Sequence, residues 1–508
     1  MRNQRGIGFI LSYVSIFISS IVGVAFTPYM ISTLGPIEYG LYQLLHATIG
    51  YVALLDFGLG STLTRFILKY KVQNDKENID IITTMCIRIY GIIAAIVMAI
   101  VFFMSFFLDS FFKESITAEN EEYAIKLLLI MGATTSISLL SHALSGIQNA
   151  YEKYAVTKGI YIFKQLFRVF VIFFLLQLNI GAMAIVIADF FVTVTLAVID
   201  VIYCKVALKS KLIFGKWKKD MFKSLFSFSF FVFLQIIVTH INIGLDRVVL
   251  GRFGTLELVA LYGVAFQLYS LFNSFGGVII GITLPRISEV VFNNSTVDVT
   301  TDSCAHYSRY QLHILAPLIG GFIVFGKHFI SLWAPDYNST HVYIIALLIV
   351  VPQILESTEG TIFNVMKAKN MQATRSVLLI CVAIFHIILS SVLVRYMPVY
   401  GTAIGTFVSF VLGNNILSNI YYHKKVGVNI FRYFKKLFKG IGLAWIISVL
   451  LGFVINLIPL GGWFGFILKG VIYVTEYAVL ILLMGINDNE KTLVKKLIEK
   501  IRRKSYVG

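Results

Sequence analysis

The sequence LGPIEYGLYQLLHATIGYVALLDFGLGSTLTR, from Leu34 to Arg65, is the stretch around which the rest of the chain is organised. It opens on a glycine–proline turn, continues as an apolar run of membrane-spanning length and closes on an arginine. A related stretch, FGTLELVALYGVAFQLYSLFNSFGGVIIGITLPR, runs from Phe253 to Arg286. A weaker pair, YEKYAVTK at 151–158 and AKNMQATR at 368–375, keeps nearly the same offset. Shared offsets at separate places indicate an internal duplication.

The composition is that of a polytopic membrane protein. Of the 508 residues, 58% are hydrophobic and only 14% are charged, which leaves too little polar surface for a soluble domain. Since a helix needs roughly 20 apolar residues to cross a bilayer, we predict an all-α fold with about fourteen transmembrane helices. The apolar runs lie near residues 7–31, 38–63, 80–108, 123–148, 157–178, 182–204, 224–250, 257–283, 308–331, 341–365, 375–395, 401–422, 438–459 and 463–486.

The duplication divides these helices into two lobes and an addition. Six helices in each lobe give both lobes the same orientation, so the repeat is parallel, about an axis along the membrane normal. The last two helices have no counterpart in the repeat. We expect an N-terminal six-helix lobe (1–204), a basic cytoplasmic linker (205–223), a C-terminal six-helix lobe (224–422), helices 13 and 14 with the preceding basic loop (423–486), and a basic amphipathic cytoplasmic tail (487–508).

The net charge of +17 is distributed unevenly among the loops. Lysines and arginines gather in alternate loops, whereas the intervening loops carry few, namely Lys113, Arg252, Lys327 and Arg395. This is the positive-inside pattern, and it predicts that both termini are cytoplasmic. It also excludes nucleic acid as the expected partner and favours anionic lipids beside the membrane.

Motifs for ATP hydrolysis and for metal binding are absent from the sequence. We find no Walker A motif, no nucleotide-binding glycine loop and no H-E-x-x-H, and the four cysteines lack metal-ligand spacing. We therefore expect no catalytic residue, no metal and no cofactor. Energy for transport would come from a proton or sodium gradient, the membrane potential or the gradient of the substrate itself.

Four motifs follow a pattern shared with a known family: LGPIEYGLY (34–42), LLDFGLGSTLTRF (54–66), GIQNAYEKYAVTK (146–158) and LDRVVLGRFG (245–254). In these the chain resembles the bacterial polysaccharide-biosynthesis, O-antigen-type oligosaccharide flippases of the multidrug/oligosaccharidyl-lipid/polysaccharide exporter superfamily. The resemblance implies a MATE-like fold, with two six-helix lobes around a central cavity. It also implies alternating-access transport of undecaprenyl-diphosphate-linked oligosaccharide repeat units to the outer leaflet of the bacterial cytoplasmic membrane.

Basic residues inside the predicted spans are the candidates for substrate binding. A charge within a bilayer costs roughly 2.5–3.5 kcal/mol on insertion scales, and a lipid diphosphate favours cations, arginine above all. The candidates are Arg88, Lys164, Arg168 and Arg247. Snorkelling to the membrane surface is the alternative for Arg88 and Lys164, and a structural lock between the lobes is the alternative for Arg247.

Acidic and histidine side chains inside the spans are the candidates for ion coupling or gating. These groups change protonation state readily when buried. The candidates are Asp56, Asp246, Glu356, Glu359 and His386. For Asp56, structural pairing with a basic residue such as Arg88 is the alternative, and nothing in the sequence places the two glutamates and His386 in one site.

Competing functions differ in the chemistry they need. The substrate of a peptidoglycan-precursor flippase carries the same diphosphate, so this function remains an alternative. A cation or drug antiporter of the same fold would need an acidic, aromatic-lined cavity, which the basic residues in the spans disfavour. An enzyme such as a polymerase or ligase would present a large external loop, and the predicted external loops are short. We expect a chain that functions as a monomer, with a polysaccharide polymerase and glycosyltransferases as further partners.

Overall fold

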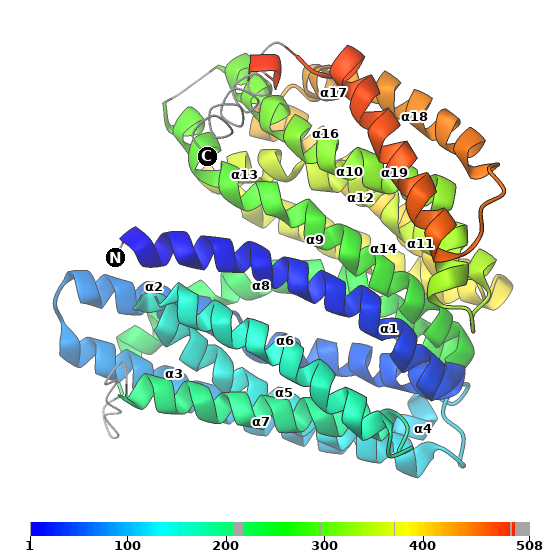
Figure 1. Ribbon diagram of the computed structural model, residues 1–508. Coiled ribbons are helices and arrows are strands. Elements are labelled where there is room, and N and C mark those ends of the chain that lie inside the picture. The colour runs from blue at the N-terminus through cyan, green and yellow to red at the C-terminus, as the bar shows by residue number, and fades with distance from the viewer. Residues whose placement is uncertain are drawn as a thin grey trace, which may run out of the picture. The chain divides into compact units, whose positions relative to one another are not determined.

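The computed structural model describes residues 2–151, 153–206, 217–293, 296–369, 371–487 and 490–492. These residues are almost all helical and contain no strand (Figure 1). The elements are α1 Arg2–Val52, η1 Ala53–Asp56, α2 Leu59–Val72, α3 Lys76–Ser105, α4 Leu108–Phe111, α5 Glu121–Ala150, α6 Tyr154–Leu176, α7 Ala182–Val206, α8 Lys219–Phe253, α9 Leu256–Phe292, α10 Val297–Trp333, α11 Ser339–Val350, α12 Gln353–Thr358, α13 Gly360–Ala368, α14 Gln372–Tyr396, α15 Gly401–Ser409, η2 Phe410–Leu417, α16 Ser418–Tyr421, η3 Tyr422–Val426, α17 Ile430–Phe438, α18 Ile441–Asn456, α19 Gly462–Leu480 and η4 Ile481–Gly485.

Membrane-spanning helices dominate the described part of the chain. Eleven helices there are long and apolar enough to cross a membrane, or twelve if the bent pair α17 and α18 is one span. One of the eleven, Phe17–Val72, is 56 residues long and covers most of two predicted spans, because α1 consists of two helices joined at the non-helical Gly35. The prediction of an all-helical membrane protein is confirmed, whereas the count of fourteen is not.

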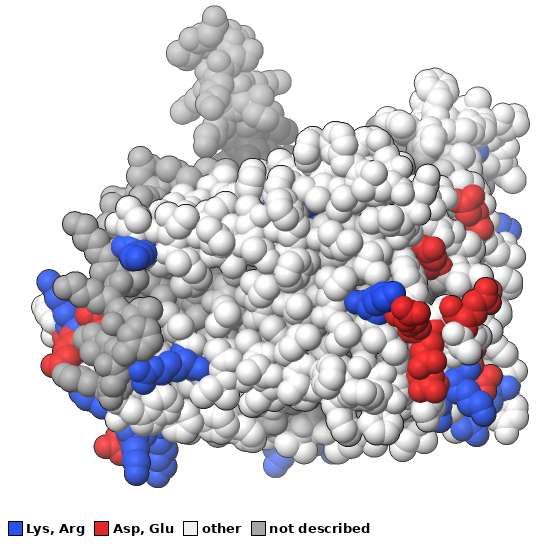
Figure 2. Space-filling model, turned by 90° about the horizontal axis from the view of Figure 1, so that it is seen from below, with Lys and Arg blue, Asp and Glu red and all other residues white. Residues whose placement is uncertain are grey.

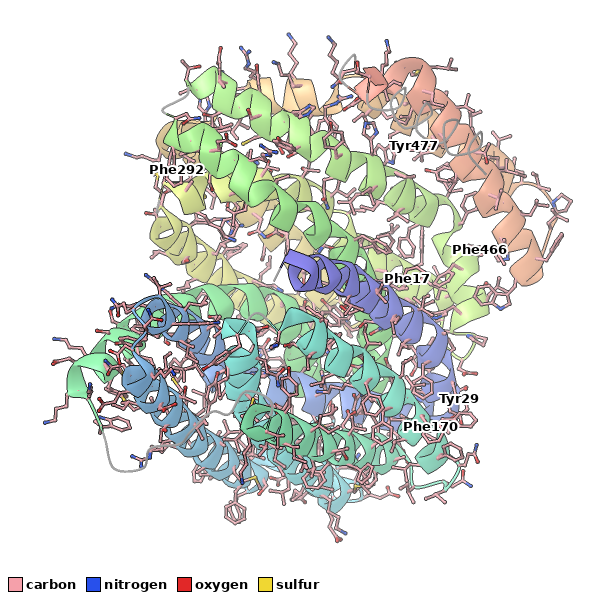
Figure 3. The ribbon with its side chains drawn as sticks, turned by 60° about the vertical axis from the view of Figure 1, so that its left-hand side comes forward. Phe17, Tyr29, Phe170, Phe292, Phe466 and Tyr477 are labelled. Atoms are coloured by element: carbon pink, nitrogen blue, oxygen red, sulfur yellow. The ribbon has the colours of Figure 1, made fainter. Side chains whose placement is uncertain are left out.

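The exposed surface is apolar, as a lipid-facing surface should be. Phe17, Phe170 and Phe292, labelled in Figure 3, are 63%, 58% and 68% exposed. On the face shown in Figure 2, charged side chains gather toward two opposite ends, and the broad band between them carries almost none. Apolar surface on this scale marks a membrane or protein interface, and its banded distribution favours a membrane.

Helix bounds recur along the chain as the sequence does. Four helical segments in the first half of the chain each have a counterpart that begins about 220 residues later, as a parallel duplication requires. The pairs are 76–105 with 297–333, 121–150 with 339–368, 154–176 with 372–396, and 182–206 with 401–426.

Packing divides the chain into two compact units. Unit 1 comprises Met1–Gln267 and Ser376–Ser409, and unit 2 comprises Leu268–Arg375 and Phe410–Gly508. The predicted lobes follow the sequence repeat and not packing, so their bounds stay a prediction. Of the predicted linker, residues 207–216 lie outside the described residues, as do 488–489 and 493–508 of the predicted tail.

The motif LGPIEYGLY holds several parts of unit 1 together. Gly35 (φ 71°, ψ 175°) provides the turn that separates the two helices of α1. Glu38 accepts a 2.7 Å hydrogen bond from the backbone N–H of Ala182 at the start of α7, where a carboxylate is favoured. Gly40 lies against the backbone of Leu256, at the start of α9. The motif is therefore a junction between α1, α7 and α9.

Gly40→Ala is expected to destabilise unit 1 by about 1–3 kcal/mol, as overpacking does. A Cβ at this position would lie 2.0 Å from the backbone carbonyl oxygen of Leu256, so one backbone segment must move. The control is Gly50→Ala on the same helix, where no atom lies within 4 Å of the added Cβ. Thermal unfolding of both variants, followed with a dye that reacts with the buried cysteine thiols, measures the effect. Equal unfolding temperatures for Gly40→Ala and wild type would contradict the predicted destabilisation.

Candidate functional site

Asp246 is the centre of a buried polar cluster in unit 1. It lies on α8 and is fully buried. One carboxylate oxygen lies 3.0 Å from Nε2 of His386 on α14 and 3.4 Å from the hydroxyl of Ser390. The other accepts hydrogen bonds from the hydroxyls of Tyr262 on α9 and Thr406 on α15. Donors of this kind offset the loss of water around a buried carboxylate. The structure thus joins two of the predicted coupling residues, Asp246 and His386.

Arg247, the next residue on α8, has a different environment. It is 6% exposed, and its Nη1 donates a 2.8 Å hydrogen bond to Oε1 of Gln43. Gln43 in turn donates to the hydroxyl of Tyr39 at 2.7 Å, and the guanidinium lies 4.2 Å from the ring centre of Phe266. Its buried Nε has no acceptor among the described residues. Adjacent helix residues point in different directions, so Asp246 and Arg247 have separate partners.

A second unpaired donor, the hydroxyl of Tyr51, lies near Gly244 of α8. It is buried without a hydrogen-bond partner among the described residues. A Cβ at residue 244 would lie 3.1 Å from this hydroxyl and 3.9 Å from Nη2 of Arg247. Buried donors left unpaired are rare in proteins and call for an explanation. The two unpaired donors come from α8 and α1.

Arg168, another predicted substrate-binding residue, is neutralised within unit 1. It forms a bidentate pair with Asp189 of α7, with nitrogen–oxygen distances of 2.5 and 3.0 Å, and its Nη2 also donates to the hydroxyl of Tyr42 at 3.4 Å. Lys164, one turn earlier on α6, is partly exposed. Asp189 was not predicted from the sequence as this partner, although an acid in the adjacent predicted span is a usable signal.

Asp56 lies at the break between α1 and α2. It accepts a 2.7 Å hydrogen bond from the hydroxyl of Tyr90 and lies 3.4 Å from Nδ1 of His142. The residues that follow, Phe57 and Gly58, both have positive φ and separate the helices. Arg88 is partly exposed on α3 and its role stays a prediction.

Unit 2 contains the other two coupling candidates. Glu359, 3% exposed, lies between α12 and α13 and accepts a 2.7 Å hydrogen bond from Nδ2 of Asn419. Glu356 on α12 lies 3.8 Å from Nη2 of Arg375. The five predicted coupling residues are therefore divided among three places, namely Asp246 with His386 and Asp56 in unit 1, and the two glutamates in unit 2. The partners Asn419 and Arg375 were not found from the sequence.

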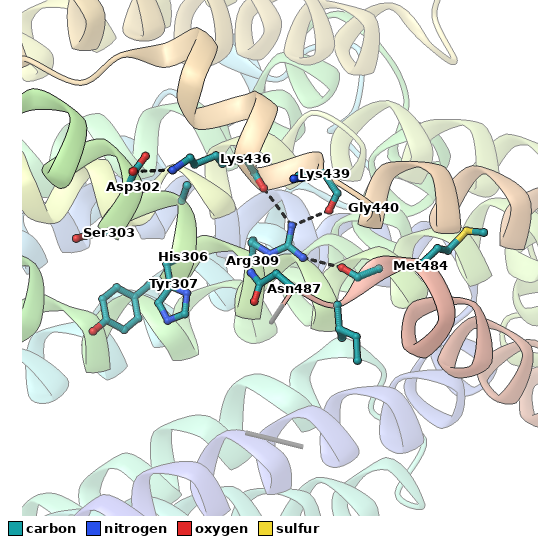
Figure 4. Close-up of a pocket in the computed structure, with 13 residues that line it drawn as sticks. Asp302, Ser303, His306, Tyr307, Arg309, Lys436, Lys439, Gly440, Met484 and Asn487 are labelled. Carbon is teal, nitrogen blue, oxygen red and sulfur yellow. Dashed lines mark hydrogen bonds and ion pairs between the residues drawn. The ribbon is translucent and has the colours of Figure 1, made fainter. Parts of the chain in front are cut away.

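A further cluster in unit 2, around Arg309 of α10, was also not predicted from the sequence. The Arg309 guanidinium forms a bidentate pair with Glu490, at 2.7 and 2.9 Å. It also donates to the backbone carbonyls of Lys436, Lys439 and Gly485 at 3.0, 2.8 and 2.7 Å (Figure 4). Both charged side chains are 4% exposed. All three guanidinium nitrogens are thus used, and this cluster joins α10 to the segments after α17 and α19.

An open cavity of about 840 Å³ adjoins this cluster. Its lining includes Asp302, His306, Tyr307, Lys436 and Asn487 (Figure 4). Two of its cationic side chains are paired, Lys436 with Asp302 at 2.6 Å and Arg309 with Glu490 at 2.7 Å. None of the nine predicted site residues lines this cavity. We interpret it as a structural cleft between α10 and the C-terminal helices.

Comparison with known proteins gives a family match and similar structures. The family model described as "Polysaccharide biosynthesis protein" matches residues 6–291. A multidrug resistance MATE family transporter of the MOP superfamily, in its inward-facing conformation, has a TM-score of 0.64 at 14% identity and covers 81% of this chain and 94% of its own. A MATE in the straight conformation has a TM-score of 0.59 at 14% identity, with coverages of 82% and 95%. No curated protein matches the chain.

These similarities confirm the predicted fold class. At 14% identity the solved structures show the fold alone, and that fold is MATE-like. The chain is therefore a multi-pass membrane protein with a transporter fold. The outward-facing form of a multidrug resistance MATE family transporter, with a TM-score of 0.54 at 14% identity, agrees.

The contact between Arg309 and Glu490 predicts how stability depends on pH. Burial raises the pKa of Glu490, but the hydrogen bonds from Arg309, His313 and the backbone N–H of Asn487, together with the charge of Arg309, lower it by more, so the net pKa lies well below the usual 4.5. A pKa that is lower in the folded state adds stability above the unfolded value, and this stability is lost as the pH falls. Wild type should therefore be more stable than Glu490→Gln by about 3–5 kcal/mol near neutral pH, and the difference should shrink below pH 4.5.

Thermal unfolding of the two proteins across the acidic range measures this difference. The control is Glu122→Gln, because the Glu122 side chain is 84% exposed and pairs with Lys126 at the surface. Exposed pairs contribute at most about 1 kcal/mol. A difference between wild type and Glu490→Gln that is absent at neutral pH, or that grows on acidification, would contradict the assigned ion pair.

Proposed function

Because the chain belongs to the polysaccharide biosynthesis protein family, as its motifs predicted, we propose that it is a lipid-linked oligosaccharide flippase. It moves undecaprenyl-diphosphate-linked repeat units from the inner to the outer leaflet of the bacterial cytoplasmic membrane, for cell-surface polysaccharide synthesis. It works by alternating access and has no enzymatic activity. Both termini lie in the cytoplasm, and the chain functions as a monomer.

The observation that carries this proposal is the environment of Arg247. Among the described residues no carboxylate lies within 4 Å of its guanidinium, and its Nε has no acceptor. The Nε–Nη2 edge of a guanidinium binds two oxygens of a phosphate at once. A buried arginine with this edge unused fits a diphosphate that must be taken out of water. Arg168 fits less well, because Asp189 already occupies the same edge.

The remaining predicted cations supply a route for the diphosphate. Arg88 and Lys164 lie on α3 and α6, both partly exposed, and Arg247 lies toward the predicted outer end of its span. We propose that the first two attract the anionic headgroup and that Arg247 holds it. A peptidoglycan precursor carries the same diphosphate and is the alternative substrate. The polysaccharide polymerase and glycosyltransferases are the proposed partners, and anionic lipids surround the basic loops.

We place ion coupling at Asp246 and His386. Asp246 accepts hydrogen bonds from the hydroxyls of Tyr262, Ser390 and Thr406, and one of its oxygens lies 3.0 Å from Nε2 of His386. Histidine is the side chain most often used to carry a proton in proteins. Because Arg247 is the next residue on α8, a shift of Asp246 also moves the side chain that we propose binds the diphosphate. We propose a proton as the coupling ion, with sodium as the alternative, and we assign no metal or organic cofactor.

Arg247→Gln is expected to slow transport about tenfold or more, because a hydrogen bond to a charged group contributes about 1.5–3 kcal/mol. The measurement is translocation of a fluorescent undecaprenyl-diphosphate oligosaccharide in proteoliposomes at matched protein levels. Arg252→Gln, five residues further along α8, is the control, since Arg252 is partly exposed and donates to the backbone carbonyls of Ser110 and Phe111. Equal rates for Arg247→Gln and wild type would remove Arg247 from the site.

His386→Gln is expected to make transport insensitive to the proton gradient. Wild type should slow several-fold when a protonophore collapses the gradient, whereas the variant should run at one rate with and without it. His423→Gln, a change at an exposed histidine, should respond as wild type does. A response to sodium removal alone, in the wild type, would replace the proton with sodium.

A further inference from the structure

The contact between Glu359 and Asn419 has an unused acceptor. Nδ2 of Asn419 donates both to Oε1 of Glu359, at 2.7 Å, and to the backbone carbonyl of Asn415, at 2.5 Å. These two bonds fix which end of the amide is nitrogen. Oδ1 of Asn419 is buried and has no donor among the described residues. An amide in this orientation is complementary to a carboxylic acid, whose O–H can donate to Oδ1 while its carbonyl oxygen accepts from Nδ2.

The balance of charges around Glu359 is also consistent with a bound proton. Two carboxylates, Glu356 and Glu359, face a single arginine, Arg375. Arg375 lies 3.8 Å from Glu356 and donates a 3.0 Å hydrogen bond to the hydroxyl of Tyr422. With both carboxylates ionised, the cluster would contain an unbalanced negative charge at a residue that is 3% exposed. Such a group neutralises itself in preference to staying charged.

Other titratable groups nearby do not supply the missing donor. The hydroxyl of Tyr433, on α17, donates to Ser308 and to the backbone carbonyl of Thr358. Lys367, on α13, lies over the ring of Phe363 at 4.5 Å. Among the described residues, Asn419 is therefore the side chain that hydrogen-bonds Glu359, and a proton on Glu359 would complete the pair.

We propose that Glu359 carries a proton in this conformation and that Glu359 with Asn419 forms a proton-binding site in unit 2. This site is separate from Asp246 and His386, which belong to unit 1. Protonated Glu359 and Asn419 form two reciprocal hydrogen bonds and carry no net charge. Loss of the proton leaves a buried carboxylate without a cation of its own and leaves Oδ1 of Asn419 unpaired.

The helical segments around the site are suited to change conformation when Glu359 loses its proton. Asn419 lies on α16, between the π-helical segments η2 and η3, and π-helical turns are frequent at functional sites. On η2, Oδ1 of Asn414 and Oδ1 of Asn415 are likewise buried without donors among the described residues. A segment with several unsatisfied polar atoms has other arrangements close in energy. Deprotonation of Glu359 would favour those arrangements.

Infrared spectroscopy of the full-length chain tests the proposal. The protein is purified in dodecyl maltoside, which has no ester carbonyl, and spectra are recorded from neutral to alkaline pH. Wild type should show the carbonyl band of a protonated carboxylic acid at neutral pH, and this band should disappear as the pH is raised. Glu359→Gln should lack the band, and the control Glu122→Gln, at a carboxylate that is 84% exposed, should keep it. A neutral-pH spectrum of Glu359→Gln that retains the band would overturn the assignment.

A second variant keeps the test decisive if Glu359→Gln does not fold. Asn419→Ala removes the donor to the acid carbonyl, so the band should remain but shift to higher frequency. An unshifted band in folded Asn419→Ala would also refute the pair. Neither measurement uses a transport substrate, so the result is independent of whether the chain moves lipid-linked oligosaccharide.

Discussion

A carboxylate without water must take its hydrogen bonds from protein, and in unit 1 this requirement falls on Asp246. Its donors come from α9, α14 and α15, so these helices are held against α8 by the need to satisfy one charge. This explains why residues 376–409 pack with unit 1, although they are distant from most of it in the sequence. Helix packing by apolar side chains alone would not specify this arrangement so strictly, because apolar contacts are non-directional.

Three arginines within helices show how one residue type acquires different roles. Arg309 uses all its nitrogens in internal bonds and is structural. Arg168 is neutralised by one carboxylate. Arg247 keeps an unused edge. The difference lies in the acceptors that neighbouring segments bring to each guanidinium. Burial of a cation therefore does not by itself indicate a binding site, and the number of unpaired donors is the more informative quantity.

The architecture could be predicted from the sequence, but most of the pairs that the buried polar side chains form could not. Hydropathy, the repeat and the turn at Gly35 are local or periodic signals, and each led to the correct class of fold. The pair Arg168 and Asp189, 21 residues apart in successive helices, lay within reach of such reasoning. Asp246 and Thr406 are 160 residues apart, and many hydroxyl residues in the spans were equally good candidates. The unpaired oxygen of Asn419 has no sequence signal, because it depends on what is missing around it.

The pairing of Arg309 with Glu490 has a consequence for biosynthesis. The two residues are separated by 181 positions, and the ribosome adds roughly 5–20 residues per second. For roughly 10–35 s after Arg309 is made, its guanidinium has no carboxylate from the tail to meet. α10 must therefore be accommodated during membrane insertion with its charge still hydrated or provisionally paired. The pair can form only once Glu490 has been made, so unit 2 reaches its final packing after the helices from α10 to α19 have all been synthesised.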